Sequence, residues 1–165
     1  MREEQEHLKT LTECEKALAE ATALSQAVAS QVQDEAHRQI AAIVSRCLST
    51  VFEEPYQFKI HFEQKRSKTE ALMVFERNGQ EIDPMTAVGG GVIAVASFAL
   101  RLACLMLSRP QKRRLLVMDE PFTHLSKEYV DNARDMLLML SREFGFQIIM
   151  VSHVEGLKCG TVIVL

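Results

Sequence analysis

A short apolar run that ends in two adjacent carboxylates constrains the fold of this chain more than any other feature. The run Leu115 to Met118 leads directly into Asp119 and Glu120, and a proline follows. Apolar residues stopped by acids and a proline predict a buried β-strand that ends there. In open α/β sheets the carboxyl ends of the strands are where ligands bind. Because neighbouring carboxylates at a buried edge are costly unless a cation meets them, this edge predicts a site for magnesium with a nucleotide triphosphate.

The composition fits one globular domain in a reducing compartment. The chain has 165 residues, 47% of them apolar, and a net charge of -3, so binding to nucleic acid would need a local basic patch. Four scattered cysteines without a CxxC pair argue against a zinc site and predict a cytoplasmic protein. The acidic and polar N-terminus is not expected to be a signal peptide, and the stretch Val92 to Leu107, which contains Arg101, is predicted to fall short of a membrane span.

The first third of the chain predicts one long helix. Residues 3–51 contain no glycine or proline and are rich in Ala, Glu and Gln. A helix of about 48 residues is about 70 Å long, and its heptad seam, which has one stutter, needs a partner helix. We therefore expect a coiled-coil arm over residues 1–52, although a long helix folded onto its own domain is the alternative. The seam consists of Leu11, Cys14, Leu18, Ala21, Ser25, Val28, Val32, Ala36, Ile40, Ile43, Cys47 and Val51.

The remaining residues, 53–165, predict an α/β lobe that opens with a hairpin or meander. Pro55 breaks the helix. The alternation over Tyr56 to Phe62 and the run Ala71 to Phe75 predict two strands, with turns at residues 65–69 and at Asn78-Gly79.

After this meander the pattern alternates between helices and strands. It predicts helices over residues 92–107 and 129–144, and strands over 115–118, 146–151 and 161–165. This order predicts a mainly parallel sheet with flanking helices. Adjacent parallel strands would bring His153, which follows the strand 146–151, to the same edge as Asp119 and Glu120.

Gly89, Gly90 and Gly91 directly precede the apolar helix. Free backbone N–H groups and the positive end of the helix dipole make such a loop a candidate anion site. A merely flexible loop is the alternative. Lys65, Arg66 and Lys68 are predicted as a solvated turn, with contact to a phosphate backbone as the alternative. The basic segment 109–114 is predicted mainly as solvated surface.

Together these motifs resemble a known family. The resemblance depends on four motifs in this order: AVGGGVIAVASFALRLACLML, LLVMDEP, THLS and IIMVSH. The chain resembles the C-terminal half of the ATPase head of SMC/SbcC/RecF-like ABC ATPases, which act in DNA repair and recombination. The resemblance covers nearly the whole chain. It implies the C-terminal lobe of a P-loop ATPase head over residues 53–165 and the returning coiled-coil arm over residues 1–52.

The resemblance also implies roles for the site residues. Asp119 would hold Mg²⁺, Glu120 would be the general base that orients the attacking water, and His153 would sense the γ-phosphate of ATP. The signature loop would be Val88, Gly89, Gly90 and Gly91, and it would contact ATP held by a second head. The D-loop would be Thr123, His124, Leu125 and Ser126.

Two departures from the family pattern matter. Val88 lies where a serine is usual and Gly91 where Gln or Glu is common, so phosphate contact would depend on backbone N–H groups. The sequence also contains no GxxxxGK[ST] motif to cradle phosphates. We therefore expect half a head, either a fragment, a split-gene product or a remnant, that hydrolyses ATP only when a Walker A-bearing half completes it.

The expected partners are that Walker A-bearing half, a second head in a head-to-head homodimer, DNA, a nuclease in some assemblies, and no membrane. The alternative function is a catalytically inactive interaction module that binds a partner through the coiled coil and the lobe. An ABC transporter nucleotide domain fits less well, because a long heptad helix precedes the signature lobe.

Overall fold

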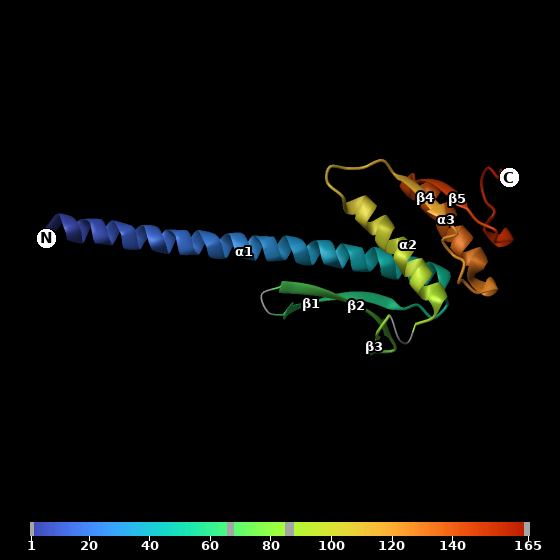
Figure 1. Ribbon diagram of the computed structural model, residues 1–165, viewed down its shortest axis with the longest axis horizontal. Coiled ribbons are helices and arrows are strands. Elements are labelled where there is room, and N and C mark those ends of the chain that lie inside the picture. The colour runs from blue at the N-terminus through green and yellow to red at the C-terminus, as the bar shows by residue number, and fades with distance from the viewer. Residues whose placement is uncertain (1, 66–67, 85–87, 164–165) are drawn as a thin grey trace. The chain divides into compact units, whose positions relative to one another are not determined.

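The computed structural model describes residues 2–65, 68–84 and 88–163, and the chain forms two compact units, residues 1–37 and 38–165. The first unit is a helix, the N-terminal part of α1 (Arg2–Val51) in Figure 1, so the predicted long helix is confirmed. Leu11, Leu18 and Val28 of the seam are 59–71% exposed. This N-terminal part of the seam is therefore open to a second helix, as a coiled coil requires. At the other end of the seam, Cys47 and Val51 are buried in the core of the second unit. The functional division into arm and lobe at residue 52 stays a prediction.

The second unit contains the predicted meander. β1 (Gln57–Lys65), β2 (Lys68–Arg77) and β3 (Gln80–Ile82) form an antiparallel sheet in that order. Asn78 and Gly79 join β2 to β3 with φ angles of 54° and 76°. Two left-handed residues are what a two-residue type I′ hairpin turn needs, and Asn-Gly supplies them. The other predicted turn includes residues 66 and 67, which lie outside the described part.

An α/β segment follows the meander. α2 (Gly90–Leu107), β4 (Leu115–Asp119), α3 (Val130–Phe144) and β5 (Gln147–Val151) alternate, with short 3₁₀ turns at Lys127–Tyr129 and Glu155–Leu157. β4 and β5 pair in parallel and lie side by side in Figure 1. α3 ends at Gly145, whose φ of 64° and N–H bond to the Leu140 carbonyl form a left-handed cap. These helices and strands agree with the sequence prediction.

The last turns of α1 belong to the core of this second unit. Val44, Leu48 and Val51 are fully buried there. The carbonyl of Val51, left without a helical partner at the end of α1, accepts a hydrogen bond of 2.9 Å from Nδ2 of Asn132 on α3. The end of α1 is thus fixed to the helix that connects β4 to β5.

The prediction that β4 is a buried strand is wrong for one of its faces. Leu115 and Val117 on β4 are 41% and 70% exposed, and Ile149 and Val151 on β5 are 51% and 55% exposed. We call these four side chains the open sheet face. Parallel sheets are normally covered by helices on both faces. In the described part of the chain, the core includes side chains of the opposite face, such as Met118, together with α2 and α3.

The predicted strand over 161–165 is also wrong for its described part. Residues 161–163 form no strand, and residues 164 and 165 lie outside the described range. Val162 and Ile163 are 50% and 80% exposed. β-branched composition favours a strand only where a neighbouring strand and a packed face are available.

α2 is long and apolar enough to cross a membrane by length and composition alone, contrary to the sequence prediction. Seven of its 18 residues, including Val95, Ala99 and Leu102, are buried against the rest of the second unit. The core helix of a globular domain passes the same test, so the length and composition of α2 are weak evidence for a membrane span.

Candidate functional site

The carboxyl end of β4 carries a strained backbone. Glu120 has a φ of 45°, which is uncommon for a residue other than glycine. Its N–H donates to the Val151 carbonyl at 2.9 Å, and its own carbonyl accepts a bond of 2.8 Å from Oγ1 of Thr123. Residues held in such conformations cost about 1–3 kcal/mol and cluster at functional sites. The strain therefore marks Glu120 as a candidate functional residue independently of any motif.

Glu120 and His153 meet at this edge, as the parallel arrangement predicts. The backbone N–H of His153 donates to Oε1 of Glu120 at 2.9 Å, and the imidazole Nδ1 lies 2.9 Å from the same oxygen. Oγ of Ser152 donates to Oε2 at 3.4 Å. The Glu120 side chain is one-third exposed and that of His153 about two-thirds, so solvent reaches both groups.

These donors stabilise the ionised carboxylate of Glu120. The hydrogen bond from the His153 side chain, aided by the His153 backbone N–H and Ser152, holds the pKa of Glu120 below its ordinary value of 4.5. A carboxyl group whose pKa is lowered in the folded state stabilises the fold at pH values above its ordinary pKa. That stabilisation disappears as the pH falls through the lowered pKa, so its loss is expected below pH 4.5.

We expect the replacement His153→Ala to raise the pKa of Glu120, because the side-chain donor and the nearby positive charge disappear together. Carbon-13 NMR titration of the Glu120 carboxyl group measures this directly. Ser152→Ala, which removes a longer bond, serves as the control and should shift the titration less. An unchanged midpoint in His153→Ala would show that the imidazole does not act on Glu120.

The Asp119 carboxylate is suited to hold a magnesium ion whose remaining ligands come from a nucleotide and water. It is exposed at the end of β4, and its carboxylate makes no hydrogen bond or ion pair with any residue that the structure describes. Residues 2–65, 68–84 and 88–163 contain no group of three or more His, Cys, Asp or Glu side chains that could hold a metal alone. Magnesium is commonly held by one or two carboxylates together with phosphate oxygens and waters. The role of Asp119 stays a prediction.

The glycine loop begins α2 and packs against the predicted D-loop. Gly89 is the N-cap and has no side-chain cap, so the first N–H groups of the helix stay available to an anion. A Cβ on Gly90 would lie 3.2 Å from Cβ of His124, and one on Gly91 would lie 3.1 Å from the His124 carbonyl oxygen and 3.2 Å from Cδ1 of Leu125. A side chain at position 91 would therefore have to displace these neighbouring atoms slightly. Val88 is partly buried and packs on the core.

Because of this contact, we expect Gly91→Ala to unfold at a lower urea concentration than Gly89→Ala. Overpacking typically costs about 1–3 kcal/mol, whereas a Cβ on Gly89 meets no atom within 4 Å. Urea denaturation followed by circular dichroism compares the two variants. Equal or greater stability of Gly91→Ala would contradict the close packing of the two loops.

The predicted D-loop is a turn anchored by apolar side chains. Phe122 is buried against Phe98 of α2, with ring centroids 5.5 Å apart, and the N–H of Leu125 bonds to the Phe122 carbonyl at 3.0 Å. Thr123, His124 and Ser126 are exposed. The turn therefore presents polar groups while its apolar residues fix it to α2.

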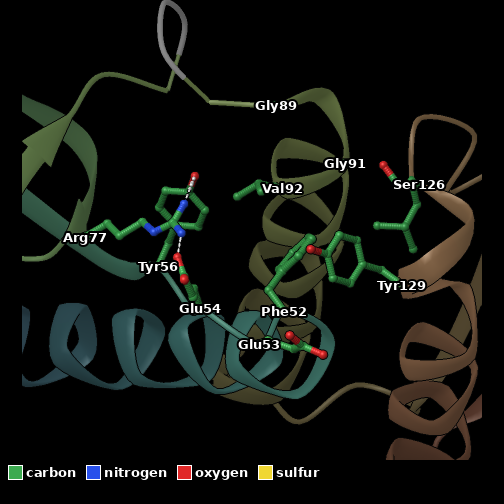
Figure 2. A pocket seen from close by; sticks show the side chains of 11 residues that line it. Phe52, Glu53, Glu54, Tyr56, Arg77, Gly89, Gly91, Val92, Ser126 and Tyr129 are labelled. Carbon is green, nitrogen blue, oxygen red and sulfur yellow. Dashed lines mark hydrogen bonds and ion pairs between the residues drawn. The ribbon is translucent and has the colours of Figure 1, made fainter.

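A pocket of about 450 Å³ opens beside the glycine loop (Figure 2). Arg77 forms an ion pair with Glu54 there, and it donates to the Tyr56 hydroxyl at 3.2 Å. None of Asp119, Glu120 and His153 lines this pocket. Sequence reasoning missed it, because its walls come from the end of α1, the meander and the D-loop. It is lined by Phe52, Glu53, Glu54, Tyr56, Arg77, Gly89, Gly91, Val92, Leu125, Ser126 and Tyr129.

The structure thus forms two groups of predicted site residues. One contains Glu120 and His153 at the carboxyl edge of the parallel strands, directly after Asp119, and Ser152, which was not predicted, joins them through its hydroxyl. The other contains Gly89 to Gly91 packed against the D-loop. The hydrogen bond from Thr123 to the Glu120 carbonyl connects the D-loop to the carboxylate edge.

Comparison with solved structures shows what kind of fold carries this arrangement. An SMC ATPase studied for ATP-driven dimerization and DNA-stimulated activation aligns with a TM-score of 0.60 and 17% identity over 77% of this chain. The Smc head domain of Pyrococcus yayanosii with a coiled coil and joint gives 0.56 and 18% over 93%. The SMC head domain from Thermotoga maritima gives 0.53 and 15% over 78%. No protein-family model and no curated protein matches by sequence.

These similarities show the fold. The chain has the α/β fold of part of an SMC-type ATPase head, with a long helix before it. The alignments span 74% of the first of those three chains, but only 30% and 43% of the Pyrococcus and Thermotoga chains. The chain therefore corresponds to only part of these last two proteins.

Proposed function

We propose that this chain is the C-terminal half of an SMC/SbcC-like ATPase head and that a Walker A-bearing lobe completes it. That lobe is either another part of a longer polypeptide or a separate subunit. The completed head would hydrolyse ATP and change how two heads associate, in the service of DNA repair, recombination or DNA processing.

The observation that carries this proposal is the open sheet face next to the carboxylate edge. Leu115, Val117, Ile149 and Val151 expose apolar surface on a parallel sheet, the class of sheet that is normally covered on both faces. At the end of that same sheet lie Asp119, Glu120 and His153. A second lobe that covered the apolar face would also bring its own residues to this edge.

The chemistry of the edge fits hydrolysis of a phosphoanhydride. Bound ATP and Mg²⁺ would supply the scissile phosphate and neutralise its developing charge. Glu120 would accept a proton from water and orient that water for in-line attack, since it is ionised and solvent-accessible. His153 would hold the Glu120 carboxylate before nucleotide arrives and would then be free to donate to a phosphate oxygen.

The glycine loop would act on the nucleotide of a second head. Its uncapped N–H groups favour an anion, and one of the similar structures is an SMC ATPase described for ATP-driven dimerization. A head-to-head dimer would therefore complete each site with Gly89 to Gly91 from the opposite head. Because Val88 packs on the core, the backbone would make this contact in place of a side-chain hydroxyl.

Hydrogen–deuterium exchange tests the completion of the head. When the Walker A-bearing lobe and its coiled-coil arm are mixed with this chain, β4 and β5 should become protected together with the exposed part of the α1 seam. If the two proteins fail to associate, or if they associate without protecting β4 and β5, the proposed completion is wrong. A chain that binds partners only through the seam would be the inactive interaction module.

A further inference from the structure

The segment between Asp83 and Asp119 has a charge pattern unlike the rest of the chain. Its 35 residues contain five basic side chains and no Asp or Glu, whereas the whole chain has a net charge of -3. The five are Arg101, Arg109, Lys112, Arg113 and Arg114. Concentration of positive charge on one segment of an acidic protein is a common mark of a surface that meets a polyanion.

Four of these five side chains lie on the connection between α2 and β4, residues 108–114, which we call the basic connection. All five side chains are exposed. In the described part of the chain, the side chains of Arg101, Arg109, Lys112 and Arg113 make no hydrogen bond or ion pair. Among the described residues, no carboxylate therefore pairs with these four side chains.

The ends of the basic connection are fixed. Oγ of Ser108 bonds to the Leu105 carbonyl at 2.9 Å, which ends α2. At the other end, Nη1 of Arg114 donates to the Phe144 carbonyl at 2.6 Å, and the Arg114 carbonyl accepts from Gln147 at 2.8 Å. Anchored ends lower the entropy that the connection would lose when it binds a ligand.

Attraction to the carbonyl end of α2 explains little of this pattern. Cations near a helix C-terminus gain about 0.3–1 kcal/mol, and the effect falls off within one turn. α2 ends at Leu107, so the effect reaches Arg109 but does not account for Lys112 and Arg113. Their charge is available for an external partner.

We propose that the basic connection binds the phosphate backbone of duplex DNA. Residues 108–114 contain no aromatic side chain to stack on unpaired bases, and Gln111 is their one exposed uncharged amide. Such a surface contacts phosphates without reading sequence. The inference deepens the proposed function, on which it rests for the choice of DNA, but the binding itself requires neither ATP nor a second lobe.

The binding is expected to be weak and strongly dependent on salt. Each phosphate contact contributes about -0.9 to the slope of log K against log salt concentration. One phosphate contact from each of the four basic side chains of the basic connection therefore predicts a slope of about -3.6. This slope corresponds to about 100-fold weaker binding when the salt concentration rises from 50 to 200 mM.

The test is fluorescence anisotropy of a labelled DNA duplex titrated with the full chain at several salt concentrations. The double variant Lys112→Glu/Arg113→Glu should bind at least tenfold more weakly at low salt, and its slope should be shallower by about two units. Lys9→Glu/Lys16→Glu changes the net charge equally on exposed positions of α1 and should leave the affinity within twofold. Circular dichroism verifies that both variants are folded.

Three results would overturn this inference. One is equal loss in both double variants, which would mean that net charge alone controls binding. The second is an affinity of Lys112→Glu/Arg113→Glu for DNA that equals that of the wild type. The third is binding of poly-glutamate in preference to DNA. DNA binding through the basic connection without ATP hydrolysis in the completed head would refute only the proposed function. Hydrolysis without such binding would refute only this inference.

Discussion

Replacement of Glu120 by glutamine is expected to abolish ATP turnover by the completed head while ATP still binds. The amide keeps the size of the side chain and can still accept the N–H of His153, which now bonds to Oε1 at 2.9 Å. It cannot accept a proton from water. Because general-base catalysis contributes about 10²–10⁴-fold to a rate, turnover should fall by that factor. ATP-bound dimers should accumulate, and sedimentation with and without ATP measures them.

Glu143→Gln is the matched control for this variant. It makes the same chemical change on an exposed residue of α3, and it should leave turnover within twofold. Full activity of Glu120→Gln would show that another group activates the water. The loss of both turnover and ATP-dependent dimers would mean that Glu120 has a structural role, since its strained backbone connects β4 to the D-loop.

The second large effect is expected from a charge placed on the open sheet face. Ile149→Lys puts an ammonium group at the centre of the surface that we propose the Walker A-bearing lobe covers. A charge without a partner is very costly to bury, so association should weaken at least 100-fold and ATP hydrolysis should disappear with it. Isothermal titration calorimetry of the two lobes measures the affinity.

Leu72→Lys provides the control for that variant. Leu72 on β2 is 50% exposed and Ile149 on β5 is 51% exposed, so both changes put a lysine on a strand at the same exposure. Both variants should keep the fold of the isolated chain. If Leu72→Lys weakened association as much as Ile149→Lys, the lobe would contact the meander and not the parallel sheet.

Local sequence patterns predicted the elements well, because each had an unambiguous signal. The alternation before Phe62, the Asn78-Gly79 pair and the helical spacing before Gly145 each correspond to an observed strand, turn or helix. The position of His153 at the same sheet edge as Glu120 was predicted too, since parallel strands joined by one helix end at the same edge. The roles assigned to these side chains stay predictions.

Sequence patterns predicted the structure less well where a segment depends on contacts with other parts of the fold. The run before Asp119 has the composition of a strand covered on both faces, but its covering layer is not among the described elements. The residues 161–163 have strand composition and no strand to pair with. The tight packing at Gly91 could not be predicted from the loop alone, because the atoms nearest to a Cβ at this position belong to His124 and Leu125. Arg77 was missed for a similar reason, since its partners Glu54 and Tyr56 lie more than 20 residues away in sequence.

Magnesium-dependent ATP hydrolysis by this chain alone, by the Walker A-bearing lobe alone and by their mixture is the most direct test of the account. If Asp119, Glu120 and His153 form the catalytic edge of a divided site, turnover should be negligible for each part and should appear when the two are combined. Turnover by this chain alone, or a mixture that associates and remains inactive, would contradict that claim.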